Sequence, residues 1–218
     1  MSVNRFIKLR NSIVSTLAGL IESRDKSTGK HVERTTAYLK VLLYAMRERG
    51  VYAKEMEKWD LDAVVSSARL HDIGKINVSD LILNKPGVLT FDEMTKMKTH
   101  TSYGESVIEG MIAESGDDED YLLNAKLFAG NHHEKFNGTG YPRGLKGTDI
   151  PIHGRVLALV DVYDALTTPR SYKEAFTHEK AKQIILESKD VHFDPLVVDV
   201  FLEVSDQFEE LSKSWKTN

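Results

Sequence analysis

The segment LDAVVSSARLHDIGK, residues 61–75, predicts a helix that carries two metal-ligand residues to its end. This helix runs from about Leu61 to Asp72 and delivers the dipeptide His71-Asp72. An unpaired imidazole or carboxylate costs on the order of a few kcal/mol to bury, so amphipathic packing alone gives no reason to place this pair there. Gly74 then allows a tight turn. The ammonium group of Lys75 can point back over the dipeptide, with a solvated surface lysine as the alternative.

Two helices are predicted before this segment. The first has apolar residues at steps of three and four, which favour one helix face packed in the core: Phe6, Leu9, Ile13, Leu17 and Leu20. The alternative is that this helix connects the domain to a sensor domain upstream. A second helix is expected over residues 29–49, and Gly50 supplies its stop.

Further histidines lie on helices predicted after residue 75. Thr90 and Glu93 form a capping box that opens a helix with His100 in its middle. The next helix ends at His132-His133, before a glycine-rich loop at residues 137–147. An apolar run then predicts another helix, which contains Asp161.

The fold class predicted from these patterns is all-α. Asp194-Pro195 combines an N-cap with proline at the first helical position, so a last helix begins there. The sequence has no convincing period-two pattern, which argues against strands, and it has no internal repeat. With 218 residues, of which 41% are hydrophobic and 28% charged, the chain can bury a sizeable core in one globular domain.

Charge and composition narrow the functional classes. A net charge of -4 argues against a protein that binds bulk nucleic acid by electrostatics. The chain has no cysteine, so any metal must be bound by nitrogen and oxygen ligands. Its apolar runs fall far short of the ~18 residues that span a bilayer, and the start lacks a signal sequence. We therefore expect a cytoplasmic protein without a membrane partner.

Seven histidine and aspartate residues form a candidate metal-binding set, spread over separate helices. Five of the eight histidines belong to it, together with two aspartates: His31, His71, Asp72, His100, His132, His133 and Asp161. Helix bundles build metal sites from inward-facing side chains of this kind, and two divalent ions can activate a bridging hydroxide for attack on a phosphoryl group. A lone buried histidine is more often a hydrogen-bonded core residue, and His153, His178 and His192 are interpreted as structural.

Six segments that occur in order along the chain form a joint pattern: HDIGKINVSDLILNKPGVLT at 71–90, MKTH at 97–100, HHEKFNGTGYP at 132–142, GLKGTDIP at 144–151, DVYDALTTPRSYK at 161–173 and HFDP at 192–195. With this pattern the sequence resembles the HD-GYP subgroup of the HD phosphohydrolase superfamily. The resemblance covers roughly Gly29 to Phe201. It implies an HD-domain helical bundle with an additional N-terminal helix, with residues 1–28 as that helix or connector and 29–218 as the phosphodiesterase domain.

The resemblance implies hydrolysis of a cyclic dinucleotide second messenger. Cyclic di-GMP is the expected substrate, cleaved to the linear dinucleotide pGpG, to GMP or to both, whereas a minority of members act on cyclic GMP-AMP. The seven residues then look like ligands of two ions, with Asp72 as the bridge. Lys75 looks like the catalytic lysine that supports the phosphate. The expected substrate-binding residues are Gly140, Tyr141, Pro142, Arg170 and Lys173; Tyr141 either stacks on a guanine or packs the loop.

The expected cofactors are two divalent ions, iron or manganese by the resemblance, with nickel, cobalt or zinc as alternatives. Some relatives bind a third ion through a glutamate four residues before the histidine that matches His31. Ser27 occupies that position here, and Glu22 and Asp25 are out of register with it. His31 itself either binds one ion or only hydrogen-bonds near it. Asp164 and Glu134 are expected to orient imidazoles rather than to bind metal.

Some features depart from the family pattern or leave alternatives open. Asn137 stands where many members carry aspartate, and the stretch between His31 and His71 is longer than expected. Most members are fused to a receiver or other sensory domain, so such a domain, a signalling partner protein and a homodimer are further expected partners. Two other functions compete with hydrolysis of a cyclic dinucleotide: a binding or adaptor module with negligible turnover, and a general HD nucleotide phosphohydrolase.

Overall fold

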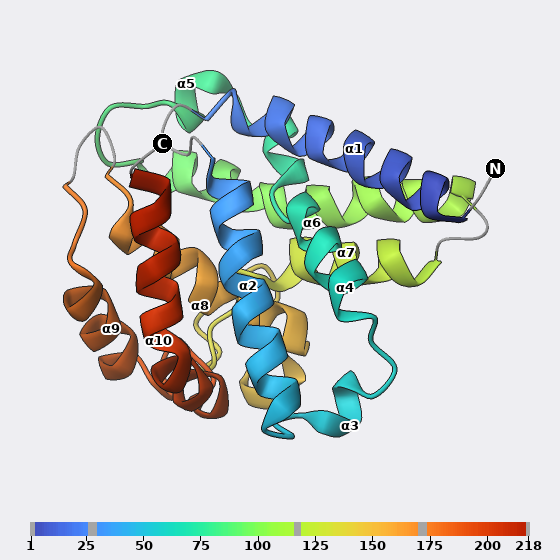
Figure 1. The fold of residues 1–218 in the computed structure, drawn as a ribbon. Coiled ribbons are helices and arrows are strands. Elements are labelled where there is room, and N and C mark those ends of the chain that lie inside the picture. Colours follow the sequence, from blue (N-terminus) through green and yellow to red (C-terminus); the bar gives the residue numbers. More distant parts are fainter. Residues whose placement is uncertain (1–2, 26–29, 116–118, 170–173, 217–218) are drawn as a thin grey trace.

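The computed structural model describes residues 3–25, 30–115, 119–169 and 174–216, and within these ranges the chain is helical and contains no strand (Figure 1). This confirms the all-α prediction. Its α-helices are α1 (Val3–Glu22), α2 (His31–Glu48), α3 (Ala53–Met56), α4 (Leu61–Ser67), α5 (Asp80–Leu83), α6 (Phe91–Ser115), α7 (Glu119–Asn131), α8 (Ile152–Thr167), α9 (His178–Glu187) and α10 (Pro195–Lys216). Three 3-10 segments join them: η1 (Ala68–Leu70), η2 (Ile73–Asn77) and η3 (Gly147–Asp149).

The helix starts follow the capping chemistry of the sequence. The capping box at the start of α6 is confirmed, because Thr90 N donates to Glu93 Oε2 (2.7 Å) and Glu93 N donates to Thr90 Oγ1 (3.3 Å). Asp194 caps α10 by accepting a hydrogen bond from Leu196 N at 2.9 Å. The predicted helix 61–72 is regular only to Ser67, after which η1 tightens the last turn before His71.

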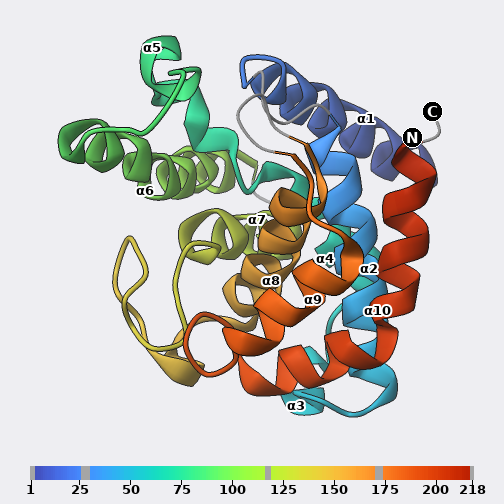
Figure 2. The ribbon, with the colours of Figure 1, turned by 90° about the vertical axis from the view of Figure 1, so that its left-hand side faces the viewer.

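Two hydrophobic cores hold the helices together. The larger core joins α2, α4, α8, α9 and α10, and α8 contributes a run of fully buried residues around Val156 and Leu159. The smaller core joins α1, η1, α6 and α7 and includes Leu70 and Ile73. These two residues flank His71-Asp72, so the dipeptide is fixed by packing on both sides. Figure 2 shows α5 and the first turns of α6 projecting away from the rest of the bundle.

Gly74 is needed for close packing of η2 against α6. A Cβ atom at Gly74 would lie 1.8 Å from the carbonyl oxygen of His100 and 2.5 Å from Gly104 N. Gly74 is not among the glycines with positive φ, so the expected reason for it, a tight turn, is replaced by this backbone contact. The contact brings the segment of His71-Asp72 onto the helix that carries His100.

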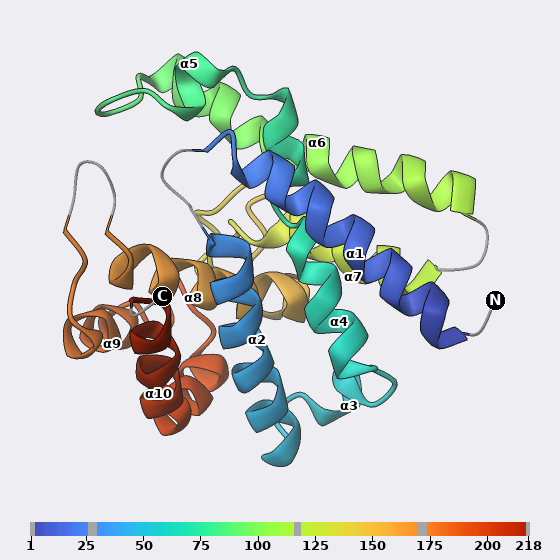
Figure 3. The ribbon, with the colours of Figure 1, turned by 45° about the horizontal axis from the view of Figure 1, so that its top comes forward.

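The prediction for the first helix was wrong about which face is buried. Its five apolar residues are exposed, with accessible fractions from 37% at Leu17 to 61% at Leu20. The buried residues are instead Val14, Ala18 and Ile21, which pack on a different face of α1. The reason is that α1 has two apolar stripes, and the bundle covers the one with the smaller side chains. Figure 3 shows α1 lying along the outside of the bundle.

No helix among the described residues is both long and apolar enough to cross a membrane. The division of the chain into a connector at 1–28 and a domain at 29–218 stays a prediction.

Candidate metal centre

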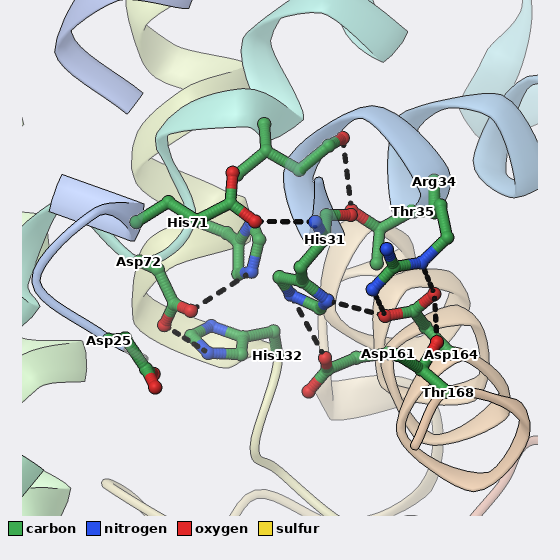
Figure 4. Close-up of polar contacts among 12 residues, drawn as sticks. Asp25, His31, Arg34, Thr35, His71, Asp72, His132, Asp161, Asp164 and Thr168 are labelled. Atoms are coloured by element: carbon green, nitrogen blue, oxygen red, sulfur yellow. Dashed lines mark hydrogen bonds and ion pairs between the residues drawn. The ribbon is translucent and has the colours of Figure 1, made fainter. Parts of the chain in front are cut away.

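The structure brings all seven predicted ligands to one place, from five parts of the fold. His31 begins α2, His71-Asp72 lies between η1 and η2, His100 is in α6, His132-His133 follows α7, and Asp161 is in α8. Two groups stand out, in each of which the candidate ligand atoms lie within 4.8 Å of one another: His31, His71 and Asp72, and His100, His132 and His133. In Figure 4 the rings of His71 and His132 point toward the Asp72 carboxylate, and His31 lies beside Asp161.

Hydrogen bonds on the outer side of these rings, which faces away from Asp72, determine which ring nitrogen carries the proton. The Nδ1–H of His71 donates to Ala68 O (2.9 Å), that of His100 to Met97 O (2.7 Å) and that of His132 to Phe128 O (3.0 Å). A carbonyl oxygen only accepts, so we assign the proton of each neutral ring to Nδ1. Each Nε2 atom therefore carries a lone pair. Outer-side hydrogen bonds of this kind orient metal-ligating histidines in proteins.

The inward-facing atoms are spaced as ligands of shared cations. His100 Nε2 and His132 Nε2 are 3.4 Å apart, and Asp72 Oδ1 lies 3.5 Å and 3.7 Å from them respectively. Asp72 Oδ2 lies 3.4 Å from His71 Nε2. Two atoms that each bind one ion at ~2.1 Å are themselves roughly 3.0–3.4 Å apart. Lone pairs that face one another this closely repel unless a cation lies between them.

Buried polar atoms without a hydrogen-bond partner also indicate that a cation belongs between these side chains. His71 Nε2 and Asp72 Oδ1 are buried and have no hydrogen-bond partner in the described structure. Buried polar groups of this type normally have a partner, and an unpaired one marks a place for an ion or water. The residues present therefore fit a metal centre of nitrogen and oxygen ligands.

The electrostatics keep most of these groups in their metal-binding forms. Burial lowers the pKa of His100, and it lowers the pKa of His132 and His133 well below the ordinary value, with help from neighbouring imidazoles. Burial opposes ionisation of Asp72, but Lys75 and His71 outweigh it and hold the pKa of Asp72 well below its usual range. Neutral imidazoles and an ionised carboxylate are the forms that bind divalent ions.

The pKa of His71 shifts in the opposite direction from the pKa values of the other three histidines. Burial acts to lower its pKa, but the adjacent Asp72 carboxylate outweighs burial and raises it. A positive charge is thus favoured between His71 and Asp72, as a bound cation would provide.

His31 is oriented by a buried ionic network. Its Nδ1–H donates to Asp164 Oδ2 (2.8 Å), and Arg34 Nε donates to Asp164 Oδ1 (2.6 Å). The opposite ring atom, His31 Nε2, lies 3.4 Å from Asp161 Oδ1. The expectation that Asp164 orients an imidazole is therefore confirmed, and the same contact directs His31 Nε2 toward the site.

Lys75 points into the site. Its Nζ lies 2.7 Å from Asp72 Oδ2 and 3.1 Å from Asp25 Oδ2. The two carboxylates outweigh burial and raise the pKa of Lys75, so the ammonium group is charged. The alternative of a solvated surface lysine does not hold, since the side chain is only 16% exposed.

Two acidic residues at the end of α1 reach the site although the sequence argument placed them out of register. Asp25 contacts Lys75, and Glu22 accepts a hydrogen bond from the backbone N–H of His31. A register counted back from His31 applies only where the chain is helical. In the structure α1 ends at Glu22 and α2 begins at His31, so spacing on a helix does not apply between them. Ser27 lies outside the described residues.

The loop after His133 is held by Glu134, which corrects a second expectation. Glu134 accepts hydrogen bonds from Arg143 N (2.8 Å) and Leu145 N (3.0 Å) and thus fixes the loop rather than an imidazole. A Cβ atom at Gly140 would lie 2.3 Å from Lys135 N, so the glycine permits this close return of the loop. Tyr141, followed by Pro142, stacks on the ring of His133, with centroids 4.7 Å apart.

The other predicted residues lie away from the ligand set or outside the described ranges. His153 Nε2 donates to Asn124 Oδ1 (2.7 Å), His178 Nδ1 lies 2.9 Å from the hydroxyl of Tyr163, and His192 stacks on Phe193. These contacts agree with structural roles. Arg170 and Lys173 lie outside the described residues.

Comparison with known proteins identifies the family. The model of the HD domain family matches residues 15–197. A Vibrio cholerae protein named probable cyclic di-GMP phosphodiesterase is 43% identical over 208 residues, which are 95% of this chain and 47% of that protein. A 3'3'-cGAMP-specific phosphodiesterase 2 of the same species is 36% identical and is matched over 95% of this chain and 38% of its own length. The chain thus spans about half the length, or less, of these curated relatives.

A solved structure supports the fold. The crystal structure of a cyclic GMP-AMP specific phosphodiesterase from V. cholerae matches 92% of this chain and 52% of its own, with a TM-score of 0.52 and 18% sequence identity. The family model covers most of the chain. The HD dipeptide, His71-Asp72, lies at the candidate metal centre, and so does the GYP segment, residues 140–142, whose tyrosine stacks on His133. The chain belongs to the HD domain family and, within it, to the HD-GYP subgroup.

Proposed function

We propose that this chain is a metal-dependent phosphodiesterase that hydrolyses a cyclic dinucleotide, with cyclic di-GMP as the substrate. The observation that carries the proposal is the set of imidazoles whose Nε2 lone pairs face the Asp72 carboxylate. The names of the relatives support the substrate class, because they include both cyclic di-GMP and cyclic GMP-AMP phosphodiesterases. The expected product is linear pGpG, GMP or both.

The proposed cofactors are two divalent ions, iron or manganese. One would be held by His31, His71 and Asp161, the other by His100, His132 and His133. Asp72 would serve both, since its Oδ2 lies nearest His71 and its Oδ1 faces His100 and His132. Paired divalent ions supply a nucleophile from water at neutral pH and neutralise charge on the phosphoryl oxygens. Nickel, cobalt and zinc suit the same ligands.

The chain's own residues have separate roles in this proposal. Lys75 offers a positive charge beside Asp72, where a phosphate oxygen gains negative charge during the reaction. Asp164 keeps the proton of His31 on Nδ1 and so leaves Nε2 free to bind metal. Gly140, Tyr141 and Pro142 form one wall of the substrate site, and Arg170 with Lys173 would bind a phosphate there.

The test is a turnover assay of metal-loaded protein with cyclic di-GMP and cyclic GMP-AMP, in which linear products are resolved. We expect hydrolysis by the wild type and its loss in Asp72→Ala and His133→Ala, because each variant removes a metal ligand. Asp62→Ala is the control, since Asp62 is exposed and pairs with Lys40. Retention of more than a tenth of the wild-type rate by a fully loaded ligand variant would contradict the assignment.

The same assay separates the two competing functions. Binding of a cyclic dinucleotide without turnover by fully loaded wild type would identify an adaptor module. Preferential hydrolysis of simple nucleotides would identify a general nucleotide phosphohydrolase. In either case the proposed phosphodiesterase activity would be wrong, whereas the metal centre could still be measured by elemental analysis.

A further inference from the structure

Arg143 directly follows the GYP segment, residues 140–142, and joins it to α6 and α7. Its guanidinium donates two hydrogen bonds to Glu105 on α6, from Nη1 to Oε2 (2.7 Å) and from Nη2 to Oε1 (3.3 Å). Nη2 also donates to Oδ1 of Asn131, the last residue of α7, at 3.2 Å. This geometry requires arginine, because only a planar guanidinium presents two parallel N–H groups to a carboxylate.

The contact with α7 lies next to the contact between Tyr141 and His133. Arg143 comes two residues after Tyr141, and Asn131 comes two residues before His133. The backbone N–H of Tyr141 donates to His133 O at 3.1 Å, and the two rings stack with centroids 4.7 Å apart. Arg143 with Asn131, and Tyr141 with His133, therefore link the same two segments of the chain at neighbouring points.

Gly130, in the last turn of α7, leaves room for these contacts. A Cβ atom there would lie 3.0 Å from Oε2 of Glu105 and 3.2 Å from Nη2 of Arg143. Glycine is less favourable than alanine inside a helix. The missing side chain lets the ion pair lie close against α7, which gives the glycine a reason to be there.

The ion pair between Arg143 and Glu105 matters for geometry more than for stability. The two side chains are 41% and 19% exposed, and pairs that water can screen add little to the free energy of unfolding. Residues 140–143, in contrast, belong to no helix, so hydrogen bonds from side chains and loop backbone must fix their position. The hydrogen bonds of the guanidinium provide this from the α6 and α7 side.

We propose that Arg143 is a positioning residue: held by Glu105 and Asn131, it sets the place of the GYP segment relative to the candidate metal centre. This rests on the proposed function, in which the segment forms one wall of the substrate site. A wall that shifts weakens contacts with the substrate in the ground state and in the transition state alike. The KM then rises while kcat changes little.

Steady-state kinetics of the metal-loaded protein test this role. Arg143→Ala should raise the KM for cyclic di-GMP about tenfold, with kcat within about twofold of the wild type and with unchanged metal content. Arg143→Lys should keep most of the increase, because it retains the charge but not the fork. Lys126→Ala is the matched control: Lys126 on α7 pairs with Glu109 on α6 at 2.7 Å, and its loss should leave the KM unchanged.

A double variant shows whether Arg143 acts through Glu105. Glu105→Gln should raise the KM by a factor similar to that of Arg143→Ala. The combination of the two should raise it no further, because both substitutions break the same contact. Additive effects, an unchanged KM in Arg143→Ala, or an equal increase in Lys126→Ala would overturn the proposal.

Hydrogen exchange followed by NMR tests the same contacts without substrate. The backbone N–H groups of Tyr141 and Leu145 are hydrogen-bonded within the loop. They should exchange about fivefold faster in Arg143→Ala and at the wild-type rate in Lys126→Ala. Unchanged exchange in Arg143→Ala would overturn the proposal whether or not the protein hydrolyses cyclic di-GMP. Faster exchange together with an inactive wild type would support the positioning contacts and contradict the proposed function.

Discussion

The ammonium group of Lys75 lies 3.1 Å from Oδ2 of Asp25, a residue just beyond the end of α1. The neighbouring Arg24 contacts the backbone of the segment that follows Lys75. Its guanidinium donates to the carbonyl oxygens of Ile76 and Val78, each at 3.0 Å. The end of α1 therefore fixes both the side chain of Lys75 and the chain that follows it.

Asp25→Asn should lower turnover roughly tenfold while leaving the metal content unchanged, because the ammonium group of Lys75 loses one of the two carboxylates that hold it. The melting temperature should also fall, since the buried ammonium group of Lys75 loses part of its charge compensation and keeps Asp72 as its remaining carboxylate. Asp62→Asn, at an exposed ion pair with Lys40, is the control for both measurements. Loss of metal from Asp25→Asn would show instead that Asp25 is a metal ligand.

A second prediction concerns the contact between Gly74 and α6. Gly74→Ala should destabilise the protein by about 2–4 kcal/mol, because the added Cβ would lie 1.8 Å from the carbonyl oxygen of His100 and backbone must move. Gly110 lies on α6 and has open space around it, so Gly110→Ala should instead stabilise the protein by about 0.5–1 kcal/mol. Urea unfolding measures both changes. Equal effects of the two substitutions would mean that η2 can shift away from α6 at little cost.

The residues that meet at the candidate metal centre could be predicted from the sequence, because adjacent pairs of ligand-type residues carry strong local information. His71-Asp72 and His132-His133 stand at helix ends, and an uncompensated buried pair of this kind is too costly to be structural. The histidines also orient themselves locally. Each of His71, His100 and His132 donates to a carbonyl three or four residues earlier, so its tautomer follows from its place on the helix.

Long-range contacts could not be predicted in the same way. The orientation of α1 depended on which of its two apolar stripes the bundle covers, and periodicity alone does not rank them. Asp25 reaches Lys75 from beyond the end of α1 at Glu22, which spacing on a helix cannot describe. Glu134 is next to His133, yet its carboxylate accepts hydrogen bonds from backbone N–H groups nine and eleven residues later.

A third prediction concerns Lys98, whose Nζ lies 5.1 Å from the ring centroid of Tyr141. Tyr141 in turn stacks on His133, so this positive charge lies beside the candidate metal centre. Lys98→Ala should raise the KM for a cyclic dinucleotide, which is anionic, by about threefold to tenfold without loss of metal. Lys96→Ala, an exposed lysine on the same helix, is the control. An unchanged KM for Lys98→Ala would exclude a contact with substrate.

The last prediction links acid sensitivity to His153, which is 4% exposed. Its ring lies between those of Trp59 and Phe128, and burial together with the charge of Arg155 lowers its pKa to about 3. In the unfolded chain the pKa is near 6.5. Between these two values the unfolded state binds a proton that the folded state does not. The contribution of His153 to the free energy of unfolding is thus fully present above about pH 6.5 and is lost as the pH falls toward 3.

His153→Gln removes this titration and retains an amide that can donate to Asn124 Oδ1. The variant should be less stable at pH 7, because it loses ring packing, but its stability should fall less steeply on acidification. From pH 7 to pH 5 the difference in unfolding free energy between wild type and variant should shrink by roughly 2 kcal/mol. All other histidines are present in both proteins, so their contributions cancel in this difference. Parallel pH profiles from urea unfolding would show that His153 already accepts a proton in the folded state.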